Sequence, residues 1–118
     1  RALFAAAQTD PLERLPELYC GFARREVTDD APVAYPVSCS PQAWAVAALP
    51  LIVRAMLGLR VELETGTIVV SPALPDWLNE ITIRDLAVRG RRGSLTVQRS
   101  GHDYSVESDG IEVELRPA

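Results

Sequence analysis

The feature that most constrains this chain is a strongly apolar helix, predicted over residues 41–57. Ser40 is a good N-cap residue, Pro41 suits the first helical turn, and Gly58 is a typical C-terminal stop. The apolar residues between these signals cover nearly every face: Ala43, Trp44, Val46, Ala47, Leu49, Leu51, Ile52, Val53, Met56 and Leu57. A helix that is apolar on every side must be buried on every side. We therefore expect further helices or a second copy of the chain to cover it.

Pro50 lies inside this helix and cannot bond the carbonyl of Val46, so we expect a kink with a local cost of about 3 kcal/mol. A membrane span needs roughly twenty apolar residues, whereas this run is shorter and contains Arg54. No stretch has the pattern of a secretory signal. The sequence predicts no membrane partner.

From Val61 onward the hydrophobic period changes to two, which is typical of strands. Thr65-Gly66 is flanked by alternating apolar residues and predicts a hairpin turn. Later alternating pairs fall at 81 and 83, 86 and 88, 95 and 97, 104 and 106, and 111–115. Reversals are expected at Gly90, Gly93, Gly101 and Asp109-Gly110. The predicted fold class is α+β, with a helical segment over 1–58 and an antiparallel meander or half sandwich over 59–118.

Basic residues are frequent in the strand region: Arg84, Arg89, Arg91, Arg92 and Arg99. We interpret them as solvated charges on outward strand positions and turns, where they discourage edge pairing. The formal net charge is −4, and no aromatic platform for bases is interleaved with the arginines. Nucleic acid is therefore not an expected partner.

The amino-terminal part predicts a helix from Ala2 to about Gln8, ended by Asp10-Pro11. Glu17 follows Pro16 and lies among apolar residues, so it is either a catalytic carboxylate or a structural one. The structural interpretation pairs it at the surface with Arg14, Arg24 or Arg25. Residues 24–34 are polar and predict an exposed connection.

Two cysteines, Cys20 and Cys39, lie near the ends of this central loop. We interpret them as largely buried thiols without a disulfide, as expected of a cytoplasmic protein. His102 is the single histidine, so the residues do not favour a metal site. No cofactor is expected.

Two motifs carry a family resemblance: Leu-Pro-Glu-Leu-Tyr-Cys-Gly-Phe at 15–22, and Tyr-Pro-Val-Ser-Cys-Ser-Pro-Gln-Ala-Trp at 35–44. Together they resemble the C-terminal end of the catalytic domain in bacterial proteins of the amylo-alpha-1,6-glucosidase (glycogen debranching) family. The resemblance is fairly specific over 15–57 and weaker at Ala-Leu-Pro-Asp-Trp, residues 73–77. It implies a six-hairpin glycosidase barrel of the (α/α)6 type whose last helix opens at Ser40. The chain would then be a C-terminal fragment of a larger hydrolase, which its helical start at Leu3 also suggests.

The resemblance further implies that Glu17 is the catalytic base in hydrolysis of α-1,6-glucosidic branches. Inverting hydrolysis also needs a carboxylic acid, roughly 6.5–9.5 Å from the base. Asp10 and Glu13 lie too close to Glu17 in sequence to supply that acid, so the isolated chain is expected to be inactive. Residues expected near an α-glucan or oligosaccharide are Tyr19, Tyr35, Gln42 and Trp44. Each of them has a core or structural interpretation of similar weight.

Two alternatives remain open. In the first alternative, the chain is a non-catalytic module that self-associates through helix 41–57. Polar substitution of Leu49 or Ile52 would then shift the association. Otherwise it is the tail of a helical-barrel disaccharide phosphorylase, whose activity would depend on phosphate.

Overall fold

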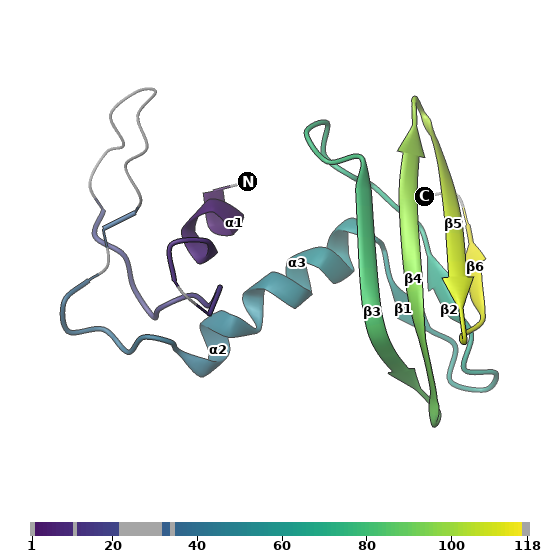
Figure 1. Ribbon diagram of the computed structural model, residues 1–118, viewed down its shortest axis with the longest axis horizontal. Helices are drawn as coiled ribbons and strands as arrows, with labels where there is room; N and C mark the ends of the chain where they lie inside the picture. Colours follow the sequence, from purple (N-terminus) through teal and green to yellow (C-terminus); the bar gives the residue numbers. More distant parts are fainter. Residues whose placement is uncertain (1, 11, 22–31, 34, 117–118) are drawn as a thin grey trace. The chain divides into compact units, whose positions relative to one another are not determined.

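The structure is a computed structural model that describes residues 2–10, 12–21, 32–33 and 35–116. The fold class is α+β as predicted, with short helices followed by strands in two small sheets (Figure 1). The chain forms two compact units, Arg1–Ile52 and Val53–Ala118. Most of the predicted connection at 24–34 lies outside the described residues. Within the described ranges, no helix has both the length and the apolar character that crossing a bilayer requires.

The first unit begins with helix α1 (Ala2–Ala7), which ends before Asp10 as the sequence predicts. The Asp10 carboxylate accepts the backbone N–H of Leu12 at 2.8 Å, which stabilises the turn after the helix. Ala6, Ala7 and Leu15 form a small buried core in this unit. Tyr19, Ala45, Ala48 and Leu49 pack against that core.

The predicted helix over 41–57 is present as two shorter helices, α2 (Ala43–Val46) and α3 (Ala48–Met56). The interruption at Ala47 lies one turn before Pro50, because proline has no N–H to bond the carbonyl of Val46. The prediction that Ser40 is the N-cap was wrong. The cap is Gln42, whose extended backbone donates its N–H to the Leu15 carbonyl at 3.2 Å, so helical geometry begins only after it.

The C-terminus of α3 ends as predicted at Gly58, whose φ is +55°. Gly58 N–H donates to Ala55 O at 3.1 Å and Leu59 N–H donates to Arg54 O at 3.0 Å. This pair of bonds is the Schellman arrangement, which satisfies carbonyls that the last helical turn leaves open.

Within the described residues, this chain does not bury the apolar helix on every face, so the expected cover by further helices or a second copy stays a prediction. Trp44 is 70% exposed and Leu51 is 63% exposed, and no residue of α2 or α3 is fully buried. The described part of the first unit offers only α1 and the segment around Leu15 as cover, so one face of the helices stays open.

The second unit contains two three-stranded sheets. One has the order β1 (Arg60–Val61), β2 (Ile68–Val70) and β6 (Val113–Leu115). The other is the antiparallel meander of β3 (Glu80–Val88), β4 (Arg91–Ser100) and β5 (Asp103–Asp109). The predicted hairpin at Thr65-Gly66 joins β1 and β2, whereas β6 leaves the meander and pairs with β2 in parallel.

Residues of both sheets share one core. The buried side chains are Leu57, Ile68, Val70, Leu74, Leu95 and Val97. A β-bulge in β3 lets the whole strand contribute to it, because the register shifts between Ile83 and Leu86 where Asp85 has a φ of +56°. The extra residue keeps Leu86 and Val88 on the same face as Ile83, although their sequence numbers differ in parity.

Candidate functional site

The five residues singled out from the sequence all lie in the first unit, on two segments around 15–20 and 33–44. Backbone hydrogen bonds join these segments although a long connection separates them in sequence. The donor and acceptor pairs are Gln42 N–H to Leu15 O at 3.2 Å, Glu17 N–H to Cys39 O at 2.9 Å, Tyr35 N–H to Leu18 O at 3.3 Å, and Cys20 N–H to Val33 O at 2.8 Å. Both motifs of the family resemblance therefore belong to one local structure.

Glu17 lies at the centre of this junction. Its N–H donates to the Cys39 carbonyl at 2.9 Å, and its carboxylate Oε2 accepts the Cys39 N–H at 3.3 Å. The side chain makes no ion pair with Arg14 within the described residues, and Arg24 and Arg25 lie outside them. Glu17 as a whole residue is half-buried, and among the described groups only Oε2 of its carboxylate has a hydrogen-bond partner. The backbone of Cys39 therefore holds Glu17 in place, and the second carboxylate oxygen has no hydrogen-bond partner among the described residues.

Tyr19 is directed toward α1. Its hydroxyl donates to the Ala6 carbonyl at 3.4 Å, and its ring packs against the core of Ala6, Ala7 and Leu15. Burial raises the pKa of Tyr19, and the negative charge of Asp10 adds to this effect. Tyr19 therefore stays a neutral hydrogen-bond donor at neutral pH, and its hydroxyl is occupied in the described structure.

The other three expected substrate contacts differ in exposure. Tyr35 is 45% exposed, and its carbonyl accepts both the N–H and the hydroxyl of Ser38. Gln42 is half-buried at the start of α2, where its side chain makes no capping bond. Trp44 is the most exposed of the set and presents an aromatic surface that a ligand or another part of a larger protein can contact.

No disulfide joins Cys20 and Cys39, and Cys39 is exposed rather than buried as predicted, because it lies in the loop opposite Glu17. Among the described residues, no group of three or more His, Cys, Asp or Glu side chains could hold a metal ion. No protein-family model matches the chain, and neither a curated protein nor a solved structure matches it.

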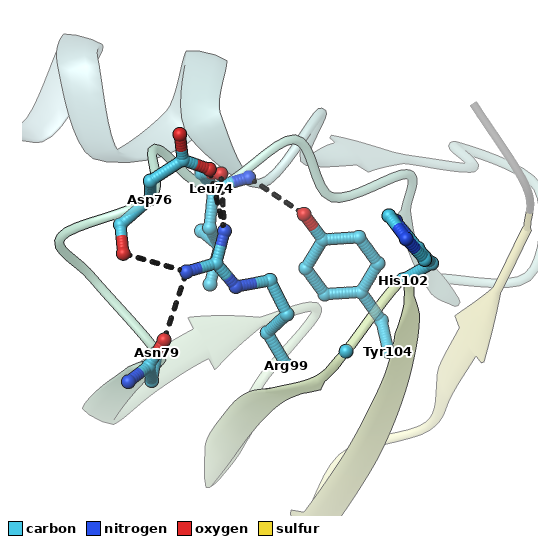
Figure 2. A pocket seen from close by; sticks show the side chains of 7 residues that line it. Leu74, Asp76, Asn79, Arg99, His102 and Tyr104 are labelled. Atoms are coloured by element: carbon cyan, nitrogen blue, oxygen red, sulfur yellow. Dashed lines mark hydrogen bonds and ion pairs between the residues drawn. The ribbon is translucent and has the colours of Figure 1, made fainter.

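A second feature, which the sequence interpretation missed, is an open pocket of about 670 Å³ in the second unit (Figure 2). It lies between the loop at 74–79, the end of β4 and the turn into β5. Its side chains include Asp76, Asn79, Arg99, His102 and Tyr104.

Arg99 was interpreted as a solvated edge charge, and this was wrong. Its side chain is only 15% exposed and bonds the 74–79 loop. The alternation of inward and outward side chains along β4 is the signal that the sequence interpretation missed. Arg99 follows Leu95 and Val97 at intervals of two, so it lies on the inward face of the strand. Arg89 is exposed at the turn after β3, as that interpretation expects, and its guanidinium donates to the carbonyls of Leu63 and Glu64.

Proposed function

We propose that this chain is the C-terminal portion of an inverting glycoside hydrolase similar to amylo-alpha-1,6-glucosidase, with Glu17 as the catalytic base. One observation carries the proposal: Glu17 bonds Cys39 through both its backbone and its carboxylate, where the two resembling motifs meet. The substrate would be an α-glucan or oligosaccharide with α-1,6 branches.

The geometry at Glu17 suits a base. The Cys39 N–H holds Oε2, and the second carboxylate oxygen can then accept a proton from water as that water attacks the anomeric carbon. A carboxylic acid on the opposite face must protonate the leaving oxygen. This two-carboxylate chemistry requires no cofactor.

The acid belongs to another part of the proposed hydrolase. Asp10 uses one carboxylate oxygen to accept the backbone N–H groups of Leu12 and Arg14, and Glu13 is exposed. Neither is a suitable partner for Glu17, so we expect the 118-residue chain alone to be inactive. The exposed side chains of Trp44 and Leu51 would contact neighbouring helices of the barrel.

The direct test is Glu17→Gln in the polypeptide that the source cell makes, assayed for glucose release from a branched α-glucan. Glutamine still accepts the Cys39 N–H but cannot take a proton, so we expect kcat to fall about 10²–10⁴-fold with little change in KM. The matched control is Glu13→Gln, which changes an exposed acid on the same segment and should leave kcat unchanged. Full activity of the Glu17→Gln variant would refute the assignment.

The two alternatives give different outcomes in the same preparation. A disaccharide phosphorylase would need inorganic phosphate for turnover. A self-associating module would show no turnover and concentration-dependent assembly, which the exposure of Trp44 and Leu51 favours. Leu51 is the better position for a polar substitution, because Leu49 packs against the core of the first unit.

A further inference from the structure

A short turn supports the backbone that holds Glu17. Segment 35–39 is attached at both ends to two adjacent residues of the other motif. At one end the Tyr35 N–H donates to Leu18 O at 3.3 Å. At the other end the Cys39 carbonyl accepts the Glu17 N–H at 2.9 Å. Four residue steps of extended chain would span roughly 13–14 Å, whereas adjacent Cα atoms are about 3.8 Å apart. The segment must therefore fold back on itself for both bonds to form.

A β-turn from Tyr35 to Ser38 provides this reversal. The Ser38 N–H donates to Tyr35 O at 3.1 Å, which closes the turn. Pro36 is at the second turn position, where its fixed φ favours a turn. The Ser38 hydroxyl donates to the same Tyr35 carbonyl at 2.9 Å, so the serine closes the turn with two hydrogen bonds. The bond from the hydroxyl is the one that a substitution can remove without changing the backbone.

The Cys39 amide follows this turn directly, so its position depends on whether the turn stays closed. That amide donates to Glu17 Oε2 at 3.3 Å, and the carboxylate has no other hydrogen-bond donor among the described residues. We propose that Ser38 is a positioning residue for Glu17, because its hydroxyl closes the turn and so holds the Cys39 amide against Oε2. The consequence of this contact for catalysis rests on the proposed function.

In the proposed hydrolase, the Glu17 carboxylate acts on the attacking water and not on substrate binding. A carboxylate that loses its fixed orientation should therefore lower kcat and leave KM unchanged. The Ser38 hydroxyl is already bonded to Tyr35 O, so we assign it no direct contact with substrate.

The first test is amide hydrogen exchange in the 118-residue chain, followed by NMR. Ser38→Ala should speed exchange of the Cys39 amide about threefold to tenfold, as expected from the loss of one hydrogen bond. The Gln42 amide donates to Leu15 O outside the turn, so its unchanged exchange would report that the first unit is folded. The matched control is Ser40→Ala, which changes an exposed serine beyond the turn and should leave the Cys39 amide as in the parent chain.

The second test is glucose release from a branched α-glucan by the polypeptide that the source cell makes. Ser38→Ala should lower kcat about threefold to tenfold with the same KM. Ser38→Thr retains the hydroxyl and should restore most of the lost kcat. Ser40→Ala should have the kcat of the parent.

Equal exchange of the Cys39 amide in the parent and in Ser38→Ala would overturn the inference. A raised KM with unchanged kcat would also overturn it, since Ser38 would then bind substrate and not orient the base. The exchange measurement involves no turnover, so it separates the two claims. Faster exchange in Ser38→Ala, together with hydrolysis that Glu17→Gln leaves intact, would count against the proposed function while the contact between turn and carboxylate holds.

Discussion

Gly93 is the position in the second unit where packing leaves no room for a side chain. It pairs with Leu86 just after the bulge of β3, and the backbone of Asp109 and Gly110 crosses directly over it. A Cβ at Gly93 would overlap the carbonyl oxygen of Asp109. The sequence interpretation placed a chain reversal here, which was wrong: Gly93 lies inside β4 and permits a close approach of backbones.

Gly93→Ala should therefore lower the free energy of unfolding of the 118-residue chain by about 3 kcal/mol or more, because the backbone of Asp109 must move. Gly101→Ala is the comparison. Gly101 has a φ of +64° but open space around it, so only the left-handed backbone is strained, at about 1 kcal/mol. Urea unfolding measures both, and equal losses for the two variants would contradict the packing argument.

At the scale of single elements, α3 ends at the core of the second unit. Leu57 follows its last turn, is fully buried, and accepts the Ser71 N–H at 2.9 Å through its carbonyl. Its side chain belongs to the core cluster that contains residues of both sheets, so it anchors the helix end in that core.

Leu57→Ala should destabilise the second unit by about 2–5 kcal/mol, the usual cost of a cavity in a well-packed core. Leu63→Ala changes the same residue type in the β1–β2 turn, where the side chain is 86% exposed, and should change stability by less than about 0.5 kcal/mol. Thermal unfolding of the two variants decides the matter. Similar melting temperatures would show that the core is centred elsewhere.

Periodicity predicted the strands and most of the helix well, because both patterns are local. The start of α2 could not be predicted, since it depends on the bond from Gln42 to Leu15, a contact between distant residues. The parallel pairing of β6 with β2 depends on a similar long-range choice. The bulge in β3 was visible in principle, as the change of parity between Ile83 and Leu86.

For the whole molecule, the sequence indicated candidate site residues in the first unit but did not indicate the pocket in the second unit. Backbone hydrogen bonds join the motifs around Glu17 and Tyr35, a contact that the sequence interpretation did not predict. The pocket beside Arg99 was not predicted because its walls come from a loop, a strand end and a turn. Its one sequence signal is the inward parity of Arg99.

The most direct test of the central claim is the anomeric form of the first glucose released, followed by proton NMR. The polypeptide from the source cell and the 118-residue chain are compared on the same branched α-glucan. We expect β-glucose from the former, since inversion of an α-linkage gives the β form, and no glucose from the latter, because the proposal places the acid in another part of the hydrolase. Release of α-glucose first, or turnover by the 118-residue chain that Glu17→Gln abolishes, would contradict the account.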